Sequence, residues 1–241
     1  MPKISVDHLP EEGFRFLAQL KKHNDRDWFN PRKEQYKELV ELPMIQLVHA
    51  AAEECRRRGL PLYAKDKSPV MRVYRDIRFS SDKTPYKTHV AAELRRSFSN
   101  SNILLYLHFS PSESLLGAGI WQPDRPLLQI WREAIAAQPQ RFAGVVGALE
   151  KQKLSLNMEH SLSTMPRGFQ NHADEVFAPW LKLTSFITSL PLSAKDGTQP
   201  GLLDRIVKFA LAAKPLLEFG WFLEQAAPER PALGLTSPKR R

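Results

Sequence analysis

The chain has a single cysteine, Cys55, so it can form neither an internal disulfide nor a metal site built from several cysteines. No apolar run approaches the roughly 18 residues that a membrane-spanning helix needs. The first residues, MPKISVDHLPEEG, lack the apolar core of a signal peptide. The histidines show no ligand spacing such as HExxH. We therefore expect a cytoplasmic protein with no membrane association, no metal and no cofactor.

Sequence motifs of several enzyme classes are also missing. The chain has no GxxxxGKS or GxxxxGKT phosphate loop, and the pair Gly117 and Gly119 is followed by Gln122 where a dinucleotide motif needs a third glycine. Neither a GxSxG elbow nor a cysteine with a motif-supported histidine is present. These absences exclude the P-loop and Rossmann interpretations and the common serine and cysteine hydrolase motifs.

Positive charge exceeds negative charge, and the net charge is +9. Such an excess favours acidic partners in general and phosphates in particular. Part of the excess belongs to the proline-rich tail at residues 228–241, which we expect to be disordered. With 42% hydrophobic residues in the chain, residues 1–227 can bury a full core, and we expect them to form a single domain. The sequence makes no prediction of the oligomeric state.

Apolar residues recur at helical spacing near both ends of the chain. A helix start at Pro10 leads into an apolar stripe that ends near Asn24. Asn30 caps a second predicted helix, which Gly59 ends and which Pro43 should kink or divide. Further predicted helical stretches are 127–135, 142–154 and 202–225.

The middle of the chain alternates between apolar and polar residues, as strands do. Short polar turns separate these runs, which favours an antiparallel meander. The predicted fold class is α+β, with an antiparallel sheet of about four or more strands covered by helices from both chain ends. The predicted strands are 71–80, 88–95, 103–109 and 115–121, with a further one within 180–190.

The first of these predicted strands opens the unusually polar stretch Met71–His89, MRVYRDIRFSSDKTPYKTH. One side of that strand is apolar except for Arg75, which must lie at an edge or meet a carboxylate or carbonyl groups, because an unpaired buried charge is costly. The other side carries Arg72 and Arg78 beside a phenol and a carboxylate. Guanidinium groups bind carboxylate or phosphate oxygens in pairs, so this side is suited to an anion.

The run RVYRDIRFSSDKTPYKTH, with NDRDWF upstream and GAGIW and MPRGF downstream, resembles the domain of unknown function family 2461, a group of bacterial proteins with some fungal relatives. The resemblance spans roughly residues 14–223 and implies no established activity. Where many relatives have three glycines before the tryptophan, this chain has Ala118 in the middle position. The resemblance implies that the following residues occupy signature positions: Arg72, Arg75, Asp76, Arg78, Phe79, Asp82, Lys83, Tyr86 and Lys87.

The first functional hypothesis is a pocket for a phosphorylated or other anionic small molecule, with or without catalysis. Cations would hold the anion, Asp76 or His89 would move a proton, and Tyr86 would position a hydroxyl or stack on a ring. Alternatively, Asp76 only locks a neighbouring arginine, and the domain binds without catalysing. The candidate catalytic residues are Asp76, His89 and Tyr86. The candidate ligand-binding residues are Arg72, Arg75, Arg78, Asp82, Lys83, Lys87, Tyr74, His108, Gly117, Gly119 and Arg167.

Two other interpretations remain open. Nucleic-acid binding is supported by the basic charge and by aromatic residues beside cations, at Tyr74, Phe79 and Tyr86. An internal ion-pair network that stabilises the sheet would use the same charges without any ligand. Under this last hypothesis Arg78→Ala should unfold the protein, whereas under the other two it should spare folding and abolish binding.

Overall fold

The computed structural model describes residues 7–65, 69–96 and 101–226, so the predicted tail at 228–241 lies outside the described residues. These ranges contain a five-stranded antiparallel sheet whose strands follow one another in sequence order. The predicted α+β class with an antiparallel sheet is therefore confirmed. The strands are β1 (Tyr63–Ala64), β2 (Val90–Arg95), β3 (Leu104–Phe109), β4 (Ser114–Ile120) and β5 (Phe186–Leu192).

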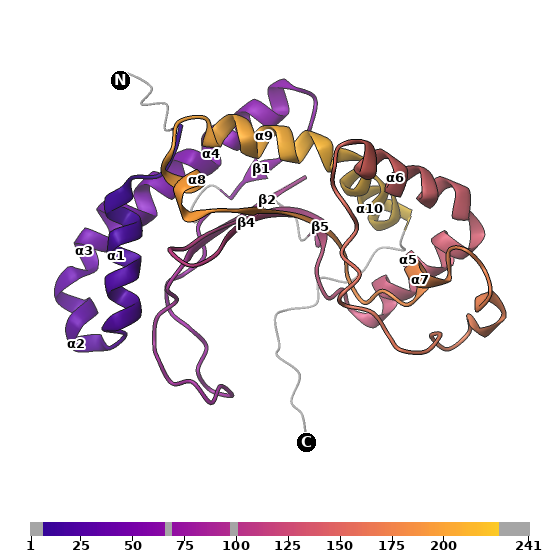
Figure 1. The fold of residues 1–241 in the computed structure, drawn as a ribbon, viewed down its shortest axis with the longest axis horizontal. Coiled ribbons are helices and arrows are strands. Elements are labelled where there is room, and N and C mark those ends of the chain that lie inside the picture. Colours follow the sequence, from indigo (N-terminus) through magenta and orange to yellow (C-terminus); the bar gives the residue numbers. More distant parts are fainter. Residues whose placement is uncertain (1–6, 66–68, 97–100, 227–241) are drawn as a thin grey trace.

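Helices cover one face of this sheet. Figure 1 shows α4 (Leu42–Arg57) and α9 (Leu202–Ala212) lying across that face, and no described helix lies across the other one. Strand side chains on the covered face are fully buried, as Leu105 and Leu107 of β3 illustrate. Each such residue stabilises the fold by about 1.5–3 kcal/mol through burial. The side chains between them point to the opposite face, here called the uncovered face. Along β3 these side chains are only half-buried.

The chain before the sheet forms a lobe of short helices: α1 (Glu11–Lys22), α2 (Arg26–Phe29), η1 (Asn30–Arg32), α3 (Lys33–Tyr36) and the π-helical turn η2 (Lys37–Glu41). The predicted cap at Asn30 is five residues late, because Asp25 caps α2 by accepting from the Trp28 N–H at 2.8 Å. Pro43 does disturb the helix, since it offers no N–H to the Leu39 carbonyl four residues earlier.

A second lobe follows β4 and contains α5 (Arg125–Ala137), α6 (Pro139–Lys151), η3 (Gln170–His172), α7 (Ala178–Leu181) and α10 (Lys214–Ala226), while the short α8 (Ala194–Thr198) follows β5. Trp131 joins this lobe to the sheet by stacking on Phe186, with ring centroids 4.3 Å apart. Arg132 is buried beside it and donates to the carbonyls of Leu181 and Leu183. Within the described ranges, no helix combines the length and the apolar character that crossing a membrane requires.

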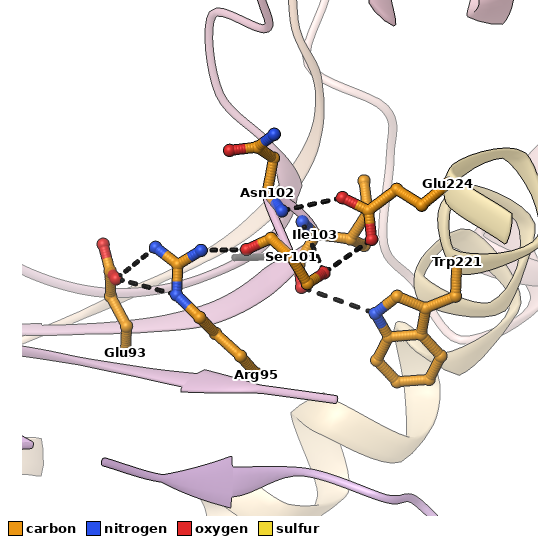
Figure 2. A network of polar contacts seen from close by, with 7 residues as sticks. All are labelled: Glu93, Arg95, Ser101, Asn102, Ile103, Trp221 and Glu224. Atoms are coloured by element: carbon orange, nitrogen blue, oxygen red, sulfur yellow. Dashed lines mark hydrogen bonds and ion pairs between the residues drawn. The ribbon is translucent and has the colours of Figure 1, made fainter. Parts of the chain in front are cut away.

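A polar network ties α10 to the connection between β2 and β3 (Figure 2). Glu224 accepts from the Asn102 backbone N–H and from the Ser101 hydroxyl, both at 2.7 Å. Trp221 donates from Nε1 to the Ile103 carbonyl at 3.4 Å. This part of the connection is therefore held by the last helix of the fold.

Candidate functional site

The polar stretch at residues 71–89 forms a projecting hairpin, called the signature hairpin below. Val70 still bridges Ala92 at the edge of the sheet, but farther along the two arms pair only with each other. Backbone bonds from Lys87 to Val73 (2.7 Å) and from Arg75 to the Pro85 carbonyl (2.9 Å) hold them together. Figure 1 shows the hairpin extending away from the sheet on the uncovered side.

The predicted strand at 71–80 is therefore wrong, although the alternation that suggested it exists. Its apolar side is buried only near the sheet, at Val73, whereas Phe79 toward the tip is 95% exposed. Beyond Val73, the hairpin is held by polar side chains and by aromatic contacts.

Tyr86 makes two aromatic contacts: its ring lies 4.1 Å from the Phe29 ring and 5.4 Å from the Tyr74 ring, measured between centroids. Asn24 fixes the same residue by donating to its carbonyl at 2.9 Å and accepting from its N–H at 3.0 Å. Tyr86 is only 2% exposed, so its ring has no free face for a ligand. The NDRDWF segment thus positions the hairpin, and the geometry supports packing as the role of Tyr86.

Two of the predicted cations already have carboxylate partners. Arg78 makes a two-pronged contact with Asp76, at 2.9 Å from Nε and 2.6 Å from Nη2. Arg75 binds the Asp82 carboxylate and the Thr84 hydroxyl, as the sequence required of an arginine on the apolar side. These pairs stabilise the outer part of the hairpin and remain accessible to solvent.

The carboxylates in these pairs are strong acids. Hydrogen bonds from Arg78 lower the pKa of Asp76 to about 2. The Thr84 backbone N–H, followed by Arg75, lowers the pKa of Asp82 to about 2. Asp76 is thus ionised and bound to arginine at neutral pH, so the geometry favours its locking role over that of an acid or base.

The remaining hairpin cations differ in their surroundings. Lys83 donates to the Ile77 carbonyl at 3.0 Å and so helps to close the end of the hairpin. Arg72 is exposed and Lys87 half-buried, and within the described ranges neither contacts a carboxylate. Burial, followed by the charge of Arg72, lowers the pKa of Lys87. Arg72 and Lys87 therefore act on each other as like charges, while Arg72 also acts on the Asp76 carboxylate without contacting it.

Two histidines continue this arrangement onto the uncovered face. His89 precedes β2 and stacks on His108 of β3, with ring centroids 4.2 Å apart. Tyr106 supports His108 through a contact of 3.2 Å between its hydroxyl and Nδ1. Burial, then His108 and Lys87, lowers the pKa of His89 to about 4. Burial also lowers the pKa of His108, so both rings are neutral at pH 7.

We call Arg72, Lys87, His89 and His108 the hairpin-base site. Charge effects link its members in a row, because Arg72 acts on Lys87, which acts on His89. All four are among the residues that the sequence singled out. Tyr106 was missed as a site residue, although its position two residues before His108 already placed it on the same side of the strand.

Arg167 does not join this site. It is exposed in the loop before η3, within the second lobe, and Figure 1 shows that lobe at the far end of the sheet from the hairpin. Tyr74, another predicted ligand contact, is partly exposed but packs against Tyr86 on the hairpin.

The two glycines of β4 have different physical roles. Gly119 has a φ of +122°, and a Cβ there would collide with the Phe186 carbonyl oxygen, so the backbone itself requires glycine. Gly117 has room for a Cβ, which would lie 3.6 Å from Tyr106. Ala118 is buried toward the helices, so the departure from three glycines does not alter the uncovered face.

The described residues contain no cluster of three or more histidine, cysteine and acidic side chains that could hold a metal ion. No curated protein and no solved structure matches the chain. A family model described as "Conserved hypothetical protein (DUF2461)" matches residues 12–219, a range that includes the signature hairpin and both glycines of β4. The match covers most of the chain, as the resemblance of the motifs implied. The chain therefore belongs to the DUF2461 family.

Proposed function

We propose that this protein binds molecules through a phosphate group at the hairpin-base site. The observation that carries the proposal is the contrast between two sets of cations on one hairpin. Arg75 and Arg78 have carboxylate partners, whereas Arg72 and Lys87 have none among the described residues. A doubly charged oxyanion would supply the direct ion-pair contact that this second set lacks.

The chemistry of the four side chains suits a phosphate group. A guanidinium offers paired donors to two oxygens, and an ammonium adds a mobile point charge. The neutral imidazoles can donate from a ring nitrogen and can take up a proton once an anion is near, because an anion raises their pKa.

We propose binding and assign no reaction. A catalytic carboxylate would need to be free of its neighbours, and Asp76 is held by Arg78. His89 has a pKa of about 4, which makes it a weak base at neutral pH.

Isothermal titration calorimetry with inorganic phosphate and pyrophosphate tests the proposal, using wild type, Arg72→Ala and the matched control Arg78→Ala. We expect Arg72→Ala to weaken binding about tenfold or more, which corresponds to about 1.4 kcal/mol. Arg78→Ala removes a cation that is already neutralised, so its affinity should stay within about threefold of wild type. Failure of wild type to bind either anion at about 10 mM would refute the proposal, and so would equal losses in the two variants.

A further inference from the structure

Trp121 is a large aromatic side chain that the fold leaves 52% exposed directly after β4. It follows Ile120, the last paired residue of β4, whose side chain is buried under the helices, so continued alternation directs Trp121 toward the uncovered face. Its ring meets His160 edge to face, with centroids 4.5 Å apart. The backbone N–H of the next residue donates to the buried Ser185 hydroxyl at 2.9 Å, which fixes the turn. A fixed indole with an open face is a suitable surface for stacking a planar ring.

Trp121 and the hairpin-base site lie at opposite ends of the uncovered face. The register pairs His108 with Leu115, six residues before Trp121 along the chain. At about 3.4 Å per residue, the two ends are separated by about 20 Å along β4. Figure 1 agrees, because the hairpin leaves the sheet at one end and the second lobe adjoins the other. A ligand that reaches both ends must therefore be elongated.

Between the two ends, the register places small or uncharged side chains and one neutral ion pair. Gly117 carries no side chain, and beside it the register places Tyr106 on β3 and the exposed Ser189 on β5. Glu93 lies on the same face, but Arg95 holds it at 2.6 Å, so the pair adds no net charge. Figure 2 shows that Arg95 also contacts the Ser101 carbonyl, which leaves it engaged within the protein.

We infer that the ligand is a short single strand of nucleic acid, which lies along the uncovered face with a phosphate at the hairpin-base site and a base on Trp121. This inference rests on the proposed function and names its ligand class. A chain that repeats phosphates and carries planar rings supplies both contacts at this separation. Phosphates of a stacked strand are about 3.4 Å apart along its axis, so the face is about six nucleotides long. The net charge of +9 is of the sign that such a partner requires.

Fluorescence anisotropy with 5′-labelled oligothymidylates and oligouridylates of two, four, six and eight nucleotides tests the inference, at a fixed salt concentration of about 150 mM. Affinity should rise with length up to about six nucleotides and then level off. Trp121→Ala should weaken binding of the six-nucleotide strand about tenfold or more, in line with the loss of one stacked base. Trp121→Phe keeps an aromatic face and should stay within about threefold of wild type.

Two further measurements keep the result interpretable. Inorganic phosphate should bind Trp121→Ala as it binds wild type, which also shows that the variant is folded. Gly117→Ala has room in the fold, so it should melt like wild type while weakening the six-nucleotide complex about threefold or more.

The outcomes separate this inference from the proposed function. If phosphate binds wild type but oligonucleotides bind no more tightly, or if Trp121→Ala binds the six-nucleotide strand like wild type, the inference is overturned and the phosphate site stands. If neither phosphate nor any oligonucleotide binds wild type, both are overturned. Oligonucleotide binding that is insensitive to both Arg72→Ala and Trp121→Ala would place the ligand elsewhere and would also overturn the inference.

Discussion

Replacing His89 by glutamine should reduce the amount by which the free energy of unfolding falls in mild acid. The pKa of His89 is lowered from 6.5 to about 4 in the folded chain by burial, by His108 and by Lys87. At a pH between these two pKa values, the imidazole is protonated in the unfolded chain and neutral in the folded chain. The free energy of unfolding therefore falls as the pH is lowered from 6.5 to 4. Glutamine has no such proton, so the variant lacks this contribution.

The size of the effect follows from the shift in pKa. A shift of about 2.5 units from 6.5 to about 4 corresponds to at most about 3.4 kcal/mol at 1.36 kcal/mol per unit. Because the ring is only partly shielded from water, solvent screening reduces this, and we expect about 1–2 kcal/mol. For a chain of this size, that equals roughly 2–8 °C in melting temperature. The charge of Glu113 acts on His108, and its effect cancels in the comparison because wild type and His89→Gln both retain Glu113.

The assay is chemical or thermal unfolding of wild type and His89→Gln at pH values from 7.5 to 4, in low salt and without phosphate. His49→Gln, which changes an exposed histidine of α4, is the matched control and should leave the pH dependence of wild type unchanged. The reasoning is refuted if wild type and His89→Gln lose the same free energy over this range. An NMR titration that places the His89 ring near its ordinary pKa of 6.5 would refute it as well.

Three other substitutions test separate parts of the structure. Gly119→Ala should destabilise the protein by more than about 3 kcal/mol or prevent folding, measured by urea unfolding, because backbone atoms block its Cβ and its φ is positive; a melt like that of wild type would contradict this. Asn24→Ala removes both hydrogen bonds to Tyr86 and should cost about 1–3 kcal/mol and speed amide exchange in the hairpin, whereas unchanged exchange would show that the asparagine does not hold it. Glu224→Ala should cost about 1–3 kcal/mol in urea unfolding and speed amide exchange between β2 and β3, and equal exchange rates would refute its anchoring role.

Much of the fold was predictable because its elements have strong local signals. The alternation along β3 and β4 and the end of α4 near Gly59 depend only on residues close together in the sequence. The π turn before α4 was not predictable in detail, and α1 packs so closely against it that a Cβ on Gly13 would collide with the Leu39 carbonyl. The proline predicted a disturbance there, but only the packed structure indicates its form.

The candidate site was predictable in its residues and not in its geometry. The sequence placed Arg72 and Arg78 on one side of a strand, but pairing with Asp76 removes Arg78 from the free cations. Which arginine an aspartate contacts depends on the turn between them, and alternation alone does not contain that information. Alternation places His89 and His108 on one side of the predicted strands, but the stacking of their rings is seen only in the folded chain, where β2 pairs with β3.

The two glycines of β4 offer a way to read the history of the family. At position 119 the backbone leaves no space for a Cβ, so glycine is required there for folding alone. Position 117 accepts a methyl group at no steric cost, so persistence of glycine there across relatives would report selection on what the surface holds. Comparing substitution at these neighbouring positions would separate the evolutionary demand of folding from that of recognition.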